Sequence, residues 1–378
     1  MRTSGPPFTI GIEEEYLLVD KETRALVVDP PDGLMEACEE RVGTQVTSEL
    51  LQSQIEIGTQ VCANIGEARD DLKRLRKGIV DVAAEHGLAP IAASTHPFSS
   101  WVDQKQTPKD RYDSLTLEMQ AAARRLLICG MHVHVGINDD ELRIDLMNQM
   151  SYFLPHLLAL SCSSPFWEGR DTGLKSYRLT VFDALPRTGV PERFASYAEY
   201  QRHVGVLMDA GLIEDTTRIW WDLRPSARYP TLETRVMDVC TSIDDTLALA
   251  SLLVCLLRML YRLRRNNQRW RIYTTMLIRE NRWRAMRYSF DEGLIDLAKG
   301  RVVRFAELLD EMIDLVAEDA EALDCVEELH SVRNILERGT SAHRQITAFE
   351  TAKAQGADDD EALRAVVDTL IEDTARNL

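Results

Sequence analysis

Residues 8–20, FTIGIEEEYLLVD, combine the pattern of a buried β-strand with three consecutive glutamates. In a strand, residues two apart point to the same face. Glu13 and Glu15 therefore share one face, and Glu14 falls on the apolar face with Phe8, Ile10, Ile12, Tyr16 and Leu18. Because Glu14 interrupts the apolar alternation, we expect it at a twist or an exposed edge. The stretch predicts a strand that packs one face on a core and presents two carboxylates on the other.

Two later stretches repeat this spacing. CGMHVHVGI (129–137) places His132 and His134 two residues apart, and TLETRVMD (231–238) does the same for Glu233 and Arg235. Three such pairs on one sheet would line a surface with carboxylates, imidazoles and a guanidinium, a set typical of a site for divalent cations and phosphate. Residues 47–61 also alternate loosely and add two carboxylates of opposite parity, so a turn or bulge must separate them if both serve the site: Glu49 and Glu56.

Each pair taken alone also fits a structural role. Two glutamates can form a solvated strand face, two histidines can be satisfied core residues, and Glu233 with Arg235 can form a simple ion pair. A zinc site would need a further nitrogen or sulfur ligand nearby in the sequence, and none is evident. Histidine mixed with carboxylates suits Mg²⁺ or Mn²⁺ better.

The overall charge limits the classes of partner. The 378 residues carry 44 basic and 61 acidic side chains, a formal charge of −17, which disfavours nucleic acid and anionic membrane as main partners. Phosphate binding would then need a local pocket. The loop 163–178 offers Arg170, Lys175 and Arg178, which form either a phosphate clamp or a solvated loop. We interpret the arginine-rich runs 264–271 and 279–287 as helices that offset the acidic segment 307–328, rather than as a nucleic-acid site.

Cysteine usage and apolar segments bear on the compartment. The seven cysteines are scattered without a C-x-x-C pair, which disfavours a disulfide framework and favours a reducing cytoplasm. The N-terminus shows no apolar signal segment. The most apolar stretch, 247–263, is too short to span a bilayer and contains Arg258, so we expect a buried core helix.

Hydrophobic periodicity predicts an α+β fold with a mainly antiparallel sheet. Strands are expected at 8–20, 24–30, 47–61, 88–94, 129–138, 219–225 and 231–239. Helices are expected at 64–86, 115–127, 142–161 (kinked at Pro155), 197–210, 244–265, 268–287, 291–298, 301–322, 325–337, 341–354 and 359–375. We expect one catalytic domain over 1–378, with its strands mostly in 8–240 and a mainly helical part at 244–378.

The order of the motifs resembles a known superfamily. GIEEEYLLVD is similar to the metal-binding strand of glutamine synthetase, CGMHVHVGI to that superfamily's G-M-H-x-H strand, and TLETR to its E-x-R strand. The sequence also contains FWEGRDTGLKSYR, RPS, RENRWRA and GTSAHRQ. With these motifs, the chain resembles the glutamate–cysteine ligase type 2 family of carboxylate–amine ligases over about residues 8–350.

The resemblance implies a curved antiparallel sheet forming a funnel with helices outside, which holds ATP and two or more Mg²⁺ or Mn²⁺ ions. One implied ligand set is Glu13, His132 and Glu233, and the other is Glu15, Glu49 and Glu56. Arg235 matches a guanidinium beside the transferring phosphoryl group and the substrate acid. Arg170 and Arg178 match loosely because the loop length differs, and the interval from Glu49 to Glu56 also departs from the glutamine synthetase pattern.

The resemblance implies an ATP-dependent ligase that joins a carboxylate to an amine through an acyl phosphate. The family name suggests glutamate and cysteine as substrates. Two alternatives remain: a phosphotransferase of the same fold, and a non-catalytic protein that binds metal or nucleotide. We expect a homodimer that uses the surface of residues 244–287.

Overall fold

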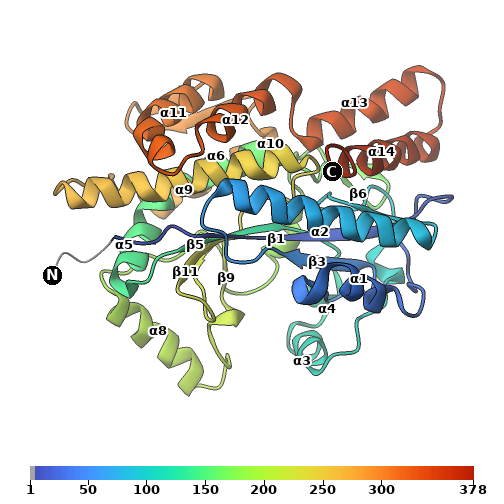
Figure 1. Cartoon of the computed structure of the whole chain (residues 1–378), viewed down its shortest axis with the longest axis horizontal. Coiled ribbons are helices and arrows are strands. Elements are labelled where there is room, and N and C mark those ends of the chain that lie inside the picture. The colour runs from blue at the N-terminus through green and yellow to red at the C-terminus, as the bar shows by residue number, and fades with distance from the viewer. Residues whose placement is uncertain (1–4) are drawn as a thin grey trace.

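The computed structural model describes residues 5–378 and is built around a seven-stranded antiparallel sheet (Figure 1). The strands are ordered β10-β11-β5-β1-β3-β2, with β4 also paired to β1. Their bounds are β1 (Ile10–Asp20), β2 (Val46–Ser48), β3 (Gln54–Gly58), β4 (Leu88–Ile91), β5 (Met131–Gly136), β10 (Leu223–Pro225) and β11 (Thr231–Thr234). The predicted α+β class with a mainly antiparallel sheet is confirmed.

Strand β1 is central because it pairs on both sides. Residues 10–14 pair with β5, residues 13–17 with β3 on the other side, and residues 17–20 with β4. Its apolar residues Ile12, Tyr16 and Leu18 are buried, as the alternation predicts. Neighbouring strands pair the backbone of β1 on both sides. Its side chains therefore project only from the two faces of the sheet, where they must find their partners.

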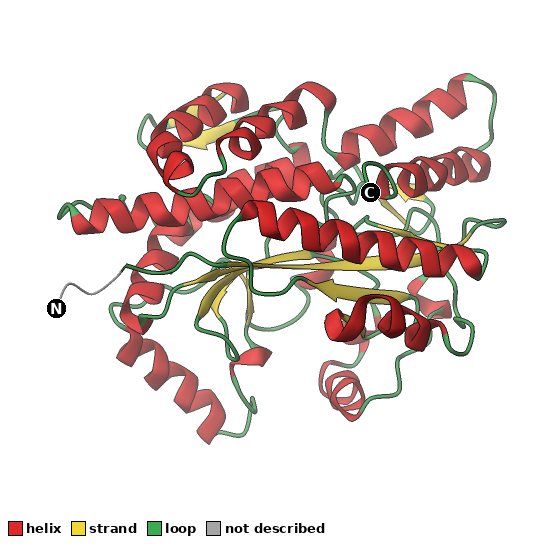
Figure 2. Cartoon of the chain, viewed as in Figure 1, coloured by secondary structure: helices red, strands yellow, loops and turns green. Residues whose placement is uncertain are grey.

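Helices α2 (Ile65–Glu85) and α9 (Ile243–Arg265) cover one face of this sheet (Figures 1 and 2). Asn64 caps α2 by accepting a hydrogen bond from the backbone N–H of Glu67, as the sequence indicates. Helix α9 is long and apolar enough to cross a membrane by composition, but most of it is buried inside the protein. The predicted core helix is therefore confirmed.

Glu14 lies on this helix-covered face and is fully buried, so the expected twist or exposed edge is wrong. Arg76 of α2 meets its carboxylate with two hydrogen bonds of 2.7 Å, and Thr246 of α9 donates a third at 2.7 Å. A buried carboxylate is tolerated here because a guanidinium neutralises it. The sequence pattern shows the charge on β1 but not its partner 62 residues away.

The remaining helices lie around the sheet. They are α1 (Leu34–Val42), α3 (Asp110–Met119), α4 (Ala121–Arg124), α5 (Asp140–Met150), α6 (Leu154–Ser161), α7 (Arg178–Phe182), α8 (Tyr197–Asp209), α10 (Thr275–Tyr288), α11 (Phe305–Ala322), α12 (Val326–Arg338), α13 (Ser341–Ala354) and α14 (Asp359–Thr374). Of these helices, α11 and α12 pack on α9 and form a layer beyond it. Three two-stranded sheets complete the fold: β6 (Phe166–Trp167) with β7 (Arg170–Asp171), β8 (Thr188–Gly189) with β9 (Trp220–Trp221), and β12 (Leu294–Asp296) with β13 (Arg301–Val303).

Several predicted elements differ from the structure. Residues 24–30 form only an isolated bridge between Leu26 and Val19 instead of a strand. The expected helix at 142–161 is two helices, with Pro155 in the first turn of α6, a position that tolerates its missing N–H. The expected helix at 291–298 and the start of the next one form the β12–β13 hairpin. This hairpin requires glycine at position 293, because the residue has a φ of 65° and a Cβ there would lie 2.0 Å from the carbonyl oxygen of Val303.

Candidate active site

A cavity of about 400 Å³ opens on the face of the sheet opposite α2 and α9. Its polar lining comes mostly from β1, β2, β3, β5, β10, β11 and residues that follow them, and Arg111, Arg178 and Arg218 add cations from outside the sheet. Its apolar wall includes Leu115, Leu126, Ile128, Phe182, Leu185 and Trp220. The cavity thus joins a charged floor on the sheet to an apolar wall, and we call it the funnel.

The strand register brings the predicted pairs side by side. Glu13 lies opposite His132, Glu15 opposite Glu56, and His134 opposite Glu233. Odd-numbered residues of β1 face the funnel because Glu14, one residue out of step, faces the helices. All seven residues that the sequence analysis assigned to metal binding line the funnel: Glu13, Glu15, Glu49, Glu56, His132, His134 and Glu233.

Three groups of these side chains have oxygen or nitrogen atoms that all lie within 4.8 Å of one another. One group is Glu15, Glu49 and Glu56, the set that the family resemblance implies. Glu49 follows β2 and Glu56 lies in β3, so the structure has the turn that their opposite parity requires.

The other two groups share Glu13 and divide the histidines. His134 lies with Glu13 and Glu233, whereas His132 lies with Glu13 and Glu56. The resemblance instead places His132 with Glu13 and Glu233. The register explains the difference, because His134, not His132, is opposite Glu233 on β11.

The carboxylates of the first group repel one another in a partly buried setting. Burial and the negative charge of Glu49 raise the pKa of Glu15 to about 7, against the opposing charge of Arg178. Burial also raises the pKa of Glu49, and burial with the charges of Glu49 and Glu13 raises the pKa of Glu56 well above its usual value. Within residues 5–378, none of these three carboxylates forms a salt bridge. The group therefore has an excess of negative charge that a cation could neutralise.

The other part of the floor, around Glu13, His132 and His134, places hydrogen-bond donors beside the carboxylate. Burial acts to raise the pKa of Glu13, but hydrogen bonding to His132 and His134 holds it well below its usual range. Burial and the charge of Arg235 lower the pKa of His132 to about 4, so this imidazole is neutral at pH 7. Its Nδ1 lies 3.3 Å from Glu13, while its buried Nε2 has no hydrogen-bond partner among the described residues. A neutral imidazole with a free ring nitrogen can coordinate a metal ion.

Two arginines flank Glu233. Arg224 approaches its carboxylate with both Nε and Nη2, at 2.8 and 3.1 Å, and Arg235 donates to it from Nη1. The positive charges of Arg235 and Arg224 outweigh burial and hold the pKa of Glu233 well below its usual range. Glu233 is therefore ionised, and its arginines border the space where a substrate anion would lie.

The three cations of the 163–178 loop have different positions. Arg178 is buried and lines the funnel. Arg170 is exposed on β7, and the ammonium of Lys175 lies 3.8 Å from Asp291. Neither Arg170 nor Lys175 lines the funnel, so the structure brings only Arg178 of the predicted clamp to the site.

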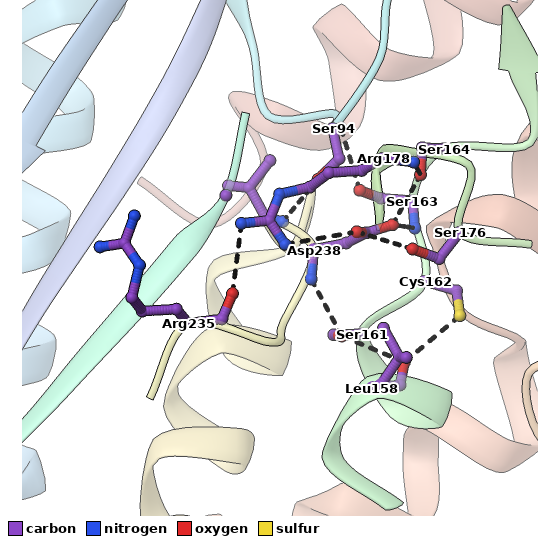
Figure 3. Close-up of polar contacts among 12 residues, drawn as sticks. Ser94, Leu158, Ser161, Cys162, Ser163, Ser164, Ser176, Arg178, Arg235 and Asp238 are labelled. Carbon is purple, nitrogen blue, oxygen red and sulfur yellow. Dashed lines mark hydrogen bonds and ion pairs between the residues drawn. The ribbon is translucent and has the colours of Figure 1, made fainter. Parts of the chain in front are cut away.

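Arg178 is held tightly between two segments (Figure 3). Its Nη2 donates to the carbonyl oxygen of Arg235 at 3.2 Å, and a Cβ on Gly130 would lie 2.4 Å from that nitrogen. The residue before Met131 must therefore be glycine for the guanidinium to rest against the backbone. Nη1 of Arg178 is buried without a hydrogen-bond partner among the described residues.

Sequence reasoning missed some of the lining. Arg224 was not assigned a role, although it lies directly opposite Glu233 across the β10–β11 hairpin, and counting outward from a turn at 227–230 would have found this pair. Arg111 and Arg218 also line the funnel. They come from α3 and from the short 3-10 helix Thr216–Arg218, and no local pattern marks them.

Comparisons with known proteins identify the family of the chain. The family model for "Glutamate-cysteine ligase family 2 (GCS2)" matches residues 9–369. A protein of Rhodospirillum rubrum named "Putative glutamate–cysteine ligase 2" is 60% identical over 99% of this chain and 97% of its own. A protein of Paracoccus denitrificans with the same name is 53% identical, with both chains fully covered.

Solved structures share the fold at low identity. Glutamate–cysteine ligase from Francisella tularensis, in complex with AMP, has a TM-score of 0.67 at 14% identity and covers 97% of this chain and 89% of its own. A bifunctional glutathione synthetase from Pasteurella multocida has a TM-score of 0.68 at 13% identity, covering 97% of this chain and 53% of its own. With the family match across nearly the whole sequence, these findings show that the chain belongs to glutamate–cysteine ligase family 2.

Proposed function

We propose that the protein is an ATP-dependent carboxylate–amine ligase that acts on a glutamate-like acid and a cysteine-like amine. The observation that carries the proposal is the funnel floor, where two clusters of ligand atoms meet at β1 beside Arg235, Arg224 and Arg178. Family membership supports the reaction class. The apolar wall offers a surface for a purine ring, and the arginines offer one for phosphate.

The residues present fit Mg²⁺ or Mn²⁺. Three mutually repelling carboxylates with raised pKa values and a neutral imidazole with an unpartnered nitrogen are hard or borderline donors. We propose that Glu15, Glu49 and Glu56 hold one ion. We propose that Glu13, Glu233 and His134 hold another. Such ions neutralise the phosphate oxygens as charge moves during phosphoryl transfer.

The protein's own groups would position the reactants. Amide formation in water needs an activated carboxylate, so the γ-phosphoryl group of ATP passes to a carboxylate oxygen of the acid to give an acyl phosphate and ADP. The amine then attacks the acyl carbon, and phosphate leaves as the amide forms. Arg235 and Arg178 would stabilise the transferring phosphoryl group in a buried site where their charge is only weakly screened.

The first experiment measures phosphate and ADP release from Mg·ATP with glutamate present, with and without cysteine, and then with a panel of other acids and amines. Phosphate release that requires both an acid and an amine is the expected result. ADP without phosphate would indicate a phosphotransferase instead, and no turnover across the panel would indicate a binding protein.

A variant pair tests the site. Glu233→Gln should lower turnover by at least about 100-fold, because it removes a charge that would face the metal and the two arginines. Glu321→Gln, at an exposed position on α11, is the matched control and should retain wild-type turnover. An active Glu233→Gln enzyme would contradict the proposed role of this residue.

A further inference from the structure

A buried aspartate lies behind the funnel and receives hydrogen bonds from both ends of the 163–178 loop. Asp238 is fully buried. Its Oδ2 accepts from the backbone N–H of Ser163 at 2.9 Å and from the hydroxyl of Ser164 at 2.8 Å, and its Oδ1 accepts from the hydroxyl of Ser176 at 2.9 Å (Figure 3). One carboxylate thus fixes the two ends of a loop that leads directly into Arg178.

The same network reaches the Arg178 guanidinium. The Ser164 hydroxyl that donates to Asp238 also accepts from the backbone N–H of Arg178, at 3.1 Å. Nη1 of Arg178 lies 4.0 Å from Oδ1 of Asp238, and Figure 3 shows the two side chains facing one another. Asp238 follows β11 by four residues, so Arg235 and Asp238 hold Arg178 from neighbouring positions of one segment.

A purely structural role would need only hydrogen-bond acceptors. Two serine hydroxyls and one backbone N–H could be satisfied by a neutral amide or a backbone carbonyl without burying a charge. Burial raises the pKa of Asp238, and the charge of Arg178, whose Nη1 lies 4.0 Å from the carboxylate, opposes that rise. The network therefore couples the loop's anchor to the one cation of the loop that lines the funnel.

We propose that Asp238 is a positioning residue that orients the Arg178 guanidinium toward the nucleotide phosphates in the funnel. Asp238 does not line the funnel and would act only through Arg178. The inference rests on the proposed function, because it takes a nucleotide phosphate as the group that Arg178 meets.

The test is a double-mutant cycle of Asp238→Asn and Arg178→Gln, read out by binding of Mg²⁺ with the non-hydrolysable analogue AMP-PNP. Each single variant should weaken binding by about 10-fold, the scale of one charge-assisted contact. The double variant should bind no more weakly than Arg178→Gln alone, because Asp238 acts through Arg178. Multiplied effects in the double variant would overturn the proposal, as would wild-type binding by Asp238→Asn.

Two further measurements separate positioning from loss of the fold. Mn²⁺ binding without nucleotide should be unchanged in Asp238→Asn, because the aspartate contacts none of the three ligand groups. Asp314→Asn, at an exposed position on α11, is the matched control for the charge change. If Asp238→Asn does not fold, Ser176→Ala takes its place in the cycle, since it removes one of the hydrogen bonds that hold the carboxylate, and the same non-additivity is expected.

The outcome also distinguishes this inference from the proposed function. A wild-type protein that does not bind AMP-PNP would refute the nucleotide site itself. A wild-type protein that binds AMP-PNP, with an Asp238→Asn variant that binds equally well, would refute only the role of Asp238. If turnover is found, kcat should fall in Asp238→Asn while the KM for the acid substrate stays the same.

Discussion

The stability of the metal-free protein should fall as pH rises from 6.5 to 8, and Mg²⁺ should reverse this fall. The pKa of Glu15 is raised from 4.5 to about 7, so between these values the folded state holds a proton that the unfolded state has lost. A folded state that binds more protons loses stability with increasing pH. Three buried histidines act in the opposite direction, because burial lowers the pKa of His96 to about 3 and the pKa values of His132 and His156 to about 4. Their effect fades above their ordinary pKa of 6.5, so toward pH 8 the carboxylates determine the slope.

The size of the effect follows from the shifts. The rise in the pKa of Glu15 from 4.5 to about 7 corresponds to roughly 3.5 kcal/mol in total. Of this, about 0.8 kcal/mol falls between pH 6.5 and 8. Glu56, whose pKa is raised further, can add up to about 2 kcal/mol in the same window. The three buried histidines offset about 1 kcal/mol of this between pH 6.5 and 8, so the expected loss of unfolding free energy is up to about 2 kcal/mol.

The assay is urea unfolding in EDTA at pH 6.5, 7, 7.5 and 8, repeated with Mg²⁺. Calorimetry of Mg²⁺ binding in two buffers of different ionisation enthalpy would count the protons released. Glu56→Gln should flatten the slope, because it removes both a titrating group and a repulsive charge, whereas the exposed Glu321→Gln should keep the wild-type slope. Stability that is flat or rises over this range, or Mg²⁺ binding without proton release, would refute the reasoning.

Two further variants test the two faces of the sheet. Arg76→Met should lower the unfolding free energy by about 3–5 kcal/mol in urea, because it leaves the carboxylate of Glu14 buried without its cation; a loss under about 1 kcal/mol would contradict this. Gly130→Ala should weaken AMP-PNP binding by about 10-fold, because the added methyl group occupies the place of Arg178 Nη2; unchanged binding would show that the guanidinium can move without consequence.

Much of the candidate site could be predicted from the sequence because strand geometry is local. The spacing of two between Glu13 and Glu15, or between His132 and His134, fixes the face without knowledge of the rest of the chain. Glu49 and Glu56 are an odd number of residues apart and would point to opposite faces of one straight strand. This spacing predicts the turn that lies between them. Each of these inferences uses only residues within one strand or one hairpin.

What the sequence could not show depends on contacts between distant segments. Which histidine joins Glu233 depends on the register of β5 against β11, about 100 residues later. The position of Arg170 outside the funnel depends on how the 163–178 loop folds over Asp238. The β12–β13 hairpin lies where a helix was expected, because residues 291–303 are too few to show a clear apolar periodicity. The hairpin also depends on the positive φ of Gly293.

Strand β1 carries carboxylates on both faces, and their partners distinguish structure from function. On one face, Arg76, Tyr16 and Thr246 satisfy Glu14 completely, so that this charge needs nothing from outside the protein. On the other face, among the residues that the structure describes, Glu15 has only the N–H of Gly130 as a donor and lies beside two further carboxylates. Glu15 has no arginine equivalent to Arg76, which lies 62 residues after Glu14 in the sequence and pairs with it. Among the residues that the structure describes, Glu15, Glu49 and Glu56 line the funnel without forming an ion pair, and we infer that the missing charge is supplied by the metal ions that the proposed reaction requires.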